Sequence, residues 1–139
     1  MTSPDKSTQQ DSLPFGSERI LIVDDEPMLV RIFQRILEDY GYAVTGTTDS
    51  REALNKVREA PQQYDLIVSD QTMPGLSGSE LAKAVLEIAP AMPIIICTGH
   101  SAVTSEEDTS AVGIKKYLLK PVVGDTLART VRMVLDEEE

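Results

Sequence analysis

Residues 65–75 read Asp-Leu-Ile-Val-Ser-Asp-Gln-Thr-Met-Pro-Gly, a short apolar run that ends at Asp70 and opens into a turn. Three other apolar runs in the chain end in polar residues in the same way. Short runs rich in Ile, Val and Leu are typical of strands buried in a parallel sheet. Open α/β sheets place their sites at the carboxyl ends of the strands, so we expect these polar residues to lie together. They are Asp24 and Asp25 after residues 20–23, Thr98 after 93–97 and Lys120 after 117–119.

Helical patterns separate the runs, and a weaker strand is expected near an edge at residues 42–46. The order of elements is therefore (βα)₅. Right-handed crossovers then favour an α/β fold with a doubly wound, five-stranded parallel sheet, flavodoxin-like, in the order 2-1-3-4-5. In that order strands 1 and 3 are neighbours, so Asp24, Asp25 and Asp70 are predicted to share one crevice.

The helices are predicted from apolar spacing and from capping signals. In the first, over residues 27–40, Pro27 suits the first turn and Gly41 the end. Asp49 and Ser77 begin patterns that resemble capping boxes for helices reaching about Ala60 and Ala89. The stretch 103–112 is predicted to be the weakest helix, and the last is expected over 125–136. The predicted core face of the first helix consists of Leu29, Ile32, Phe33, Ile36, Leu37 and Tyr40.

Composition limits the kind of protein. A chain of 139 residues fits one domain, and a net charge of −10 argues against a nucleic-acid surface. The single cysteine, Cys97, excludes an internal disulfide and is expected to be a small buried residue. No apolar run is long enough to span a bilayer, and the N-terminus lacks the apolar core of a signal peptide. We therefore expect a cytoplasmic domain without membrane contact; the oligomeric state is not indicated.

The ends of the chain differ in composition from the middle. Residues 1–17 are rich in Ser, Thr, Gln, Asp and Pro without apolar periodicity, which predicts a disordered tail or linker. The folded domain is expected over 18–136, and residues 137–139 are expected to form an acidic tail.

The polar residues at the strand ends suit one chemistry. Three adjacent carboxylates repel each other unless a cation joins them, and Mg²⁺ favours oxygen ligands. A hydroxyl and an ammonium group beside them would stabilise the charge of a phosphoryl group. A single aspartate after a strand would more often be a turn or capping residue. The matching positions of Thr98 and Lys120 favour the site instead.

Four motifs now carry a resemblance: Val-Asp-Asp-Glu-Pro at 23–27, Ser-Asp-Gln-Thr-Met-Pro-Gly at 69–75, Cys-Thr-Gly-His at 97–100 and Leu-Lys-Pro at 119–121. Over residues 18–136 the sequence resembles a response-regulator receiver domain of two-component signalling. The resemblance implies a phosphorelay switch rather than a turnover enzyme. In such a switch Asp70 takes a phosphoryl group from a phosphohistidine on a histidine kinase or a histidine phosphotransfer protein, and the domain then dephosphorylates itself.

The resemblance also implies roles for the other site residues. Asp25, Asp24 (often through water), Asp70 and the carbonyl of Thr72 would bind Mg²⁺. Thr98 would hydrogen-bond the phosphoryl oxygens, and Lys120 would pair with Asp70 or its phosphate. The Lys120–Pro121 peptide would be cis. Tyr117 would turn inward when the Thr98 hydroxyl moves to the phosphate, and His100 would either approach the phosphate or face water.

Two residues depart from the commonest pattern of the family. Gln71 is polar where many receivers carry an apolar residue, and Thr72 is small where a bulky or amide side chain often stands. Separately, the helical pattern of residues 27–40 leaves Met28, Arg31 and Arg35 on an exposed stripe beside the acidic residues. We expect a phosphohistidine protein to dock there, although an ordinary solvated helix flank would look the same.

Several alternatives remain at this point. An aspartyl phosphatase of the haloacid-dehalogenase type would need a second Asp two residues after the nucleophile, where Thr72 stands. A flavin-binding module would need aromatic residues in its loops, which are lacking. A degenerate docking receiver would not need the complete acidic and lysine set. The segment 13–16, Leu-Pro-Phe-Gly, resembles the joint before the C-terminal receiver of a hybrid sensor histidine kinase, and a stand-alone receiver is the other possibility.

Overall fold

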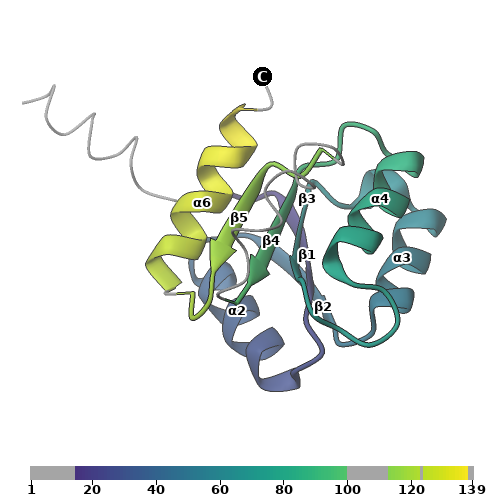
Figure 1. Ribbon diagram of the computed structural model, residues 1–139. Coiled ribbons are helices and arrows are strands. Elements are labelled where there is room, and N and C mark those ends of the chain that lie inside the picture. The colour runs from purple at the N-terminus through teal and green to yellow at the C-terminus, as the bar shows by residue number, and fades with distance from the viewer. Residues whose placement is uncertain (1–14, 100–112, 123, 138–139) are drawn as a thin grey trace, which may run out of the picture.

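The computed structural model describes residues 15–99, 113–122 and 124–137, which form one parallel sheet with helices on both faces (Figure 1). Its strands follow the predicted order, β2-β1-β3-β4-β5. The elements are β1 (Arg19–Val23), α2 (Pro27–Asp39), β2 (Ala43–Thr47), α3 (Ser50–Glu59), η1 (Pro61–Gln63), β3 (Leu66–Asp70), α4 (Gly78–Ile88), β4 (Ile94–Thr98), β5 (Lys116–Leu119) and α6 (Gly124–Glu137).

Two apolar layers hold the helices to the sheet. Helices α2 and α6 cover one face and α3 and α4 cover the other, as Figure 1 shows. Alternate residues of β1 enter the two layers, since successive strand residues point to opposite faces. Thus Ile20 and Ile22 pack toward α2 and α6, whereas Leu21 and Val23 pack toward α3 and α4. The central strands β3 and β4 are buried along their whole length, as their unbroken apolar runs predicted.

The helix ends follow their local sequence signals. Ser77 and Glu80 form the predicted capping box at the start of α4, with reciprocal side chain to backbone hydrogen bonds. Asp49 caps α3 by accepting hydrogen bonds from two backbone N–H groups, but Glu52 does not return the bond and bonds the Thr47 hydroxyl instead. Gly41 follows α2 with a φ of 105°, a conformation that glycine adopts without steric cost.

The predicted core face of α2 is wrong in part. Val30, Phe33 and Leu37 are the buried residues of this helix, whereas Ile32 is 44% exposed. The helix lies close over Gly46 of the edge strand β2, and a Cβ at that glycine would come within 2.5 Å of Val30 Cγ1. Because Gly46 has no side chain, Val30 can pack inward against β2. The buried face of α2 is therefore turned toward Val30 and away from Ile32.

The described chain also extends beyond the domain limits expected from composition. Gly16 donates a backbone hydrogen bond to the carbonyl of Tyr40, and the ring of Phe15 packs on that of Tyr40. Glu137 is the last residue of α6 rather than part of a tail. The expectation for residues 1–14 and the weak helix predicted at 103–112 lie outside the described residues.

Candidate functional site

The carboxyl ends of β1 and β3 bring the predicted acidic residues together. One carboxylate oxygen from each of Asp24, Asp25 and Asp70 lies within 4.8 Å of the others. Asp24 and Asp70 are buried, with 1% and 6% exposure, whereas Asp25 is exposed. The register of the sheet causes this convergence, because Val23 of β1 is paired with Ser69 of β3, directly before Asp70.

Lys120 completes the cluster from the loop after β5. Its Nζ lies 2.8 Å from Asp70 Oδ1 and 3.5 Å from Asp24 Oδ2. Its backbone N–H donates to the carbonyl of Thr98 at 2.7 Å, which ties the end of β5 to the end of β4. The Lys120–Pro121 peptide is cis, as the resemblance predicted. Thr98 is the buried last residue of β4, so all four strand ends named by the sequence meet at this edge.

The electrostatics of the cluster follow from burial and from its mixed charges. Burial is the main cause that raises the pKa of Asp24; the Asp70 charge adds to it, while the Glu26 N–H and Lys120 act against it. Burial alone would lower the pKa of Lys120, but its hydrogen bond to Asp70 and the charge of Asp24 outweigh burial and raise it. Lys120 is thus held as a cation beside three carboxyl groups.

The cluster suits a hard divalent cation. Three carboxylates face one ammonium group, so two negative charges would remain without a further cation if all ionise. Asp24 is already oriented, because its Oδ1 accepts a hydrogen bond from the Glu26 N–H at 3.0 Å. Oxygen ligands from a few carboxylates, with water completing the shell, are typical of Mg²⁺ sites. The donor set therefore fits Mg²⁺.

The remaining predicted residues have less uniform positions. Thr72 is exposed in the turn after β3, and Tyr117 is half-buried on β5, packed against the layer of α3 and α4. Cys97 is buried, and burial chiefly raises the pKa of its thiol to about 12, which fits the small apolar role expected of it. His100 lies outside the described residues.

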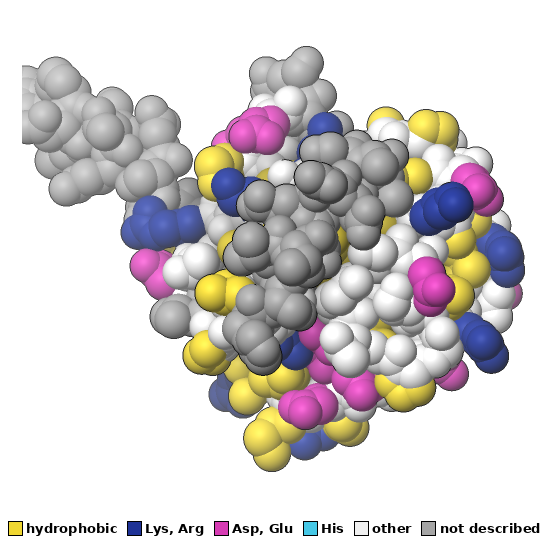
Figure 2. Space-filling view, viewed as in Figure 1, with side chains coloured by type: hydrophobic (Ala, Val, Ile, Leu, Met, Phe, Trp, Pro, Cys, Tyr) yellow, Lys and Arg dark blue, Asp and Glu magenta, His cyan; other side chains and the backbone are white. Residues whose placement is uncertain are grey.

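The exposed stripe on α2 is present and is wider than the sequence predicted. Met28 is 63% exposed, and Arg31 and Arg35 are exposed beside it. Ile32, assigned to the core from the sequence, joins them and lines a shallow surface pocket of about 420 Å³. In Figure 2 acidic side chains lie close to hydrophobic and basic side chains over α2.

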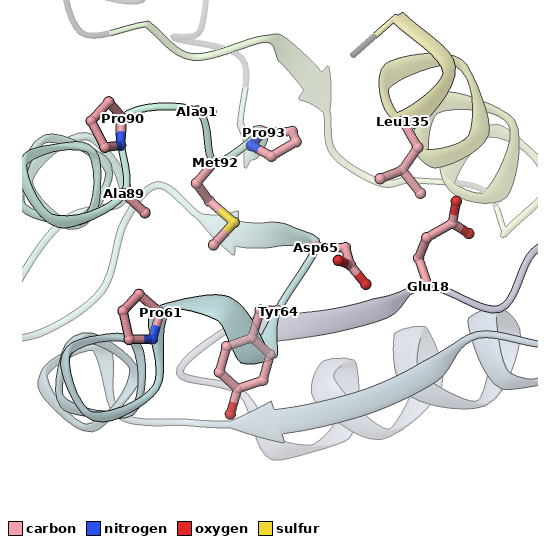
Figure 3. A pocket seen from close by; sticks show the side chains of 10 residues that line it. All are labelled: Glu18, Pro61, Tyr64, Asp65, Ala89, Pro90, Ala91, Met92, Pro93 and Leu135. Carbon is pink, nitrogen blue, oxygen red and sulfur yellow. The ribbon is translucent and has the colours of Figure 1, made fainter. Parts of the chain in front are cut away.

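A pocket of about 440 Å³ lies at the opposite edge of the sheet, where the strands begin (Figure 3). Its wall is mainly apolar, with Tyr64, Met92 and Leu135. Its two acidic side chains, Glu18 and Asp65, each form an ion pair with an arginine. Each carboxylate of this pocket thus has its own arginine, whereas at the other edge three carboxylates share one lysine.

Sequence reasoning did not predict the contacts that two polar residues, Gln71 and Ser50, make with the segment after β3. The Gln71 side chain accepts hydrogen bonds from Ser79 at the start of α4, and the Ser50 hydroxyl bonds the loop after β3 at Pro74 and Leu76. The unusual polarity of Gln71 was a usable signal, because a polar side chain next to a buried strand end needs a partner. Ser50 carried no such signal.

Comparison with known families identifies the domain. The family model for the response regulator receiver domain matches residues 20–132, which include the acidic cluster, Thr98 and Lys120. The chain belongs to this family. A receiver domain is the phosphoacceptor unit of two-component signalling and acts as a switch. Membership also removes the phosphatase and flavin-binding alternatives.

Relatives and solved structures agree with this assignment. The receiver domain is 37% identical over 114 residues to the two-component response regulator ARR18 of Arabidopsis thaliana, covering 82% of this chain and 18% of that protein. It is 34% identical over 116 residues to the transcriptional regulatory protein ZraR of Escherichia coli, covering 84% of this chain and 26% of ZraR. It therefore spans about a quarter or less of the length of these relatives.

Among solved structures, the chemotaxis protein CheY4 of Vibrio cholerae is similar, with a TM-score of 0.79 and 33% identity over 86% of this chain and 99% of CheY4. A receiver domain protein from Clostridium thermocellum gives a TM-score of 0.82 at 29% identity, over 87% and 96% of the two chains. In the described part of this receiver domain, no helix has the length and apolar character needed to cross a membrane.

Proposed function

We propose that Asp70 is the phosphoacceptor of this receiver domain. The observation that carries the proposal is the position of the buried Asp70. Its Oδ1 lies 2.8 Å from Lys120 Nζ, and one of its carboxylate oxygens lies within 4.8 Å of a carboxylate oxygen of Asp24 and of Asp25. A carboxylate is itself a nucleophile, so no separate base is needed. One Asp70 oxygen attacks the phosphorus of a phosphohistidine. The P–N bond breaks, and its electron pair stays on the imidazole nitrogen.

The neighbouring residues stabilise the charge on the transferring phosphoryl group. Lys120 offers its ammonium group, and the Thr98 hydroxyl donates to a phosphoryl oxygen. Mg²⁺, when bound by Asp24, Asp25, Asp70 and the carbonyl of Thr72, supplies further positive charge at the phosphoryl oxygens. The same residues would position water for the domain to remove its own phosphoryl group.

The assignment is tested by labelling with a small phosphodonor. Acetyl phosphate with Mg²⁺ should add one acid-labile phosphoryl group, seen by intact-mass measurement, and Asp70→Asn should abolish it. Asp65→Asn is the matched control, because Asp65 lies at the opposite edge of the sheet and should leave labelling unchanged. Equal labelling of wild type and Asp70→Asn would exclude Asp70 as the acceptor.

We also propose that a histidine kinase or a histidine phosphotransfer protein docks on the stripe of Met28, Arg31 and Arg35 on α2, extended by Ile32. The helix begins two residues after Asp25, so a partner lying on it could bring a phosphohistidine to Asp70. Exposed methionine and isoleucine offer adaptable apolar contact, and the two arginines suit an acidic flank.

Met28→Asp tests this surface. It should slow transfer from a phosphohistidine protein, because it places a charge in an apolar contact, and should leave labelling by acetyl phosphate nearly unchanged. Met133→Asp places the same change on an exposed methionine of α6 and should affect neither reaction. If Met28→Asp slows both donors equally, the change acts on the site or the fold and the docking proposal fails.

Finally, we propose that Thr98 and Tyr117 respond together to phosphorylation, with Tyr117 turning inward. The link between the two strand ends through Lys120 and Thr98 supports a shared response. Amide exchange of free and beryllofluoride-bound protein tests it: protection should change along β5 as well as beside Asp70. A change confined to the surroundings of Asp70 would indicate a domain that relays phosphate without switching.

A further inference from the structure

A chain of polar contacts leads from the residue after the phosphoacceptor to Tyr117. Gln71 Oε1 accepts hydrogen bonds from the backbone N–H of Ser79 at 2.9 Å and from its hydroxyl at 3.1 Å. Ser79 Oγ in turn lies 3.5 Å from the hydroxyl oxygen of Tyr117. All three side chains are half-buried, so water competes with these contacts less than at an open surface.

The direction of each hydrogen bond in this chain is fixed. The Ser79 N–H needs an acceptor, so the amide atom that faces it is the Gln71 oxygen. That oxygen can only accept, so the Ser79 hydroxyl donates its one hydrogen to it. Tyr117 must therefore be the donor in the last contact. The three residues form one directed chain, in which Tyr117 donates to Ser79 and Ser79 donates to Gln71.

The backbone supports the same connection. The N–H of Gly78 donates to the carbonyl of Gln71 at 2.9 Å, and a Cβ at Gly78 would come within 2.5 Å of the Asp70 carbonyl oxygen. The first turn of α4 is thus packed directly on the backbone of the acceptor. A displacement of residues 70–71 would therefore also move Ser79, since the backbone at Gly78 leaves no room for a Cβ between the two segments.

We propose that Gln71 and Ser79 are positioning residues for Tyr117, forming a second link between the phosphoacceptor and β5 that does not pass through Thr98. This inference rests on the proposed function of Asp70 and Tyr117. The Tyr117 hydroxyl can donate only one hydrogen bond, and in this position it donates that bond to Ser79. If phosphorylation turns Tyr117 inward, that bond is lost. This chain of hydrogen bonds therefore opposes the inward turn of Tyr117. With Gln71 in place of an apolar residue, phosphorylation must supply more free energy to switch this receiver.

The test is a double-mutant cycle on beryllofluoride binding. Ser79→Ala removes only the hydroxyl and keeps the backbone bond to Gln71, and Tyr117→Phe removes the donor. Each should tighten beryllofluoride binding about two- to fivefold in an NMR titration with Mg²⁺, because a hydrogen bond that favours the unswitched position is gone. The double variant should bind no tighter than either single variant, since both remove the same contact. Ser17→Ala changes an exposed serine near the start of the described chain, distant in sequence from Ser79, and should bind beryllofluoride like the wild type.

The two proposals fail in different ways. Unchanged affinity in Ser79→Ala, or additive effects of Ser79→Ala and Tyr117→Phe, would overturn the positioning role while acetyl phosphate still labels Asp70. Absence of labelling and of beryllofluoride binding in the wild type would instead overturn the proposed function, and the positioning role with it.

Discussion

Asp24 shows at the scale of one residue how the site stores unfavourable energy. Its carboxylate is buried, and burial together with the Asp70 charge raises its pKa. The folded protein therefore holds the Asp24 proton more tightly than the unfolded chain does. Near neutral pH, well above the ordinary pKa, ionised Asp24 lowers the stability of the fold. A bound cation would offset that cost.

Asp24→Asn should therefore raise the metal-free melting temperature by a few degrees. An asparagine oxygen can still accept the hydrogen bond from the Glu26 N–H, but it carries no charge that must be buried. Mg²⁺ should raise the melting temperature of the wild type by mass action and that of the variant by less. Thermal unfolding followed by circular dichroism, with and without Mg²⁺, measures both. A variant that melts below the metal-free wild type would contradict this account.

Gly78 is required for a different physical reason, the close approach of α4 to the end of β3. Gly78→Ala should lower the free energy of unfolding by about 1–3 kcal/mol, because its Cβ would meet the rigid Asp70 carbonyl. Gly124→Ala is a matched control, since Gly124 also begins a helix and the atoms nearest its Cβ would be side-chain atoms of Ile36, at 3.0 Å or more, rather than backbone. Urea unfolding of the two variants tests the difference. Equal losses would show that the contact with Asp70 is not the cause.

At the scale of elements, the loop after β3 is fastened to the start of α3. The buried Ser50 hydroxyl donates to the carbonyl of Pro74 at 3.1 Å and accepts from the N–H of Leu76 at 2.9 Å. Between them Gly75 has a φ of 81°. This loop continues the turn that carries Thr72, so Ser50 fixes the loop from which a carbonyl ligand for Mg²⁺ is proposed.

Ser50→Ala should lower the free energy of unfolding by about 1 kcal/mol, because it removes one donor and one acceptor at once. Hydrogen exchange of the Leu76 amide should become faster by a larger factor than that of the Ser69 amide within β3, which should speed up only as much as the loss of overall stability requires. Amide exchange followed by NMR separates the local effect from the global one. Uniform acceleration at both positions would mean that the change only lowers overall stability.

At the scale of the whole molecule, Arg132 of α6 joins the two ends of the described chain. Its guanidinium donates to both carboxylate oxygens of Glu18, to the carbonyl of Phe15 and to Asp136. The hydrogen bond from Arg132 is the main cause that lowers the pKa of Glu18 below 4.5. A carboxyl with a lowered pKa adds stability above its ordinary pKa, and this is lost as the pH falls through the lowered value.

Glu18→Gln should therefore cost less than about 1 kcal/mol at neutral pH, because the pair is partly exposed. The stability curves of wild type and variant should converge as the pH falls below 4.5, where the wild-type carboxyl takes up its proton. Urea unfolding across this pH range is the measurement. A gap that stays constant with pH would mean that Glu18 acts through packing rather than through its charge.

The sequence alone determined the strand order and the edge of the sheet at which the acidic residues and Lys120 converge. This was possible because buried parallel strands need unbroken apolar runs, and the residue that ends such a run must lie at the carboxyl edge. Short-range signals also predicted the capping box at Ser77 and the helix end at Gly41, since both depend on a few neighbouring residues.

The tertiary structure decided what depends on partners distant in the sequence. The face that α2 buries was set by its approach to Gly46. The helix carries more apolar residues than it buries, so its periodicity alone does not decide between Val30 and Ile32. The contacts of Gln71 with Ser79 and Tyr117, and of Ser50 with the loop after β3, join residues whose partners no local pattern indicates. The residue type shows that a buried polar side chain needs a hydrogen bond. Only the packing of the whole chain decides which residue is its partner.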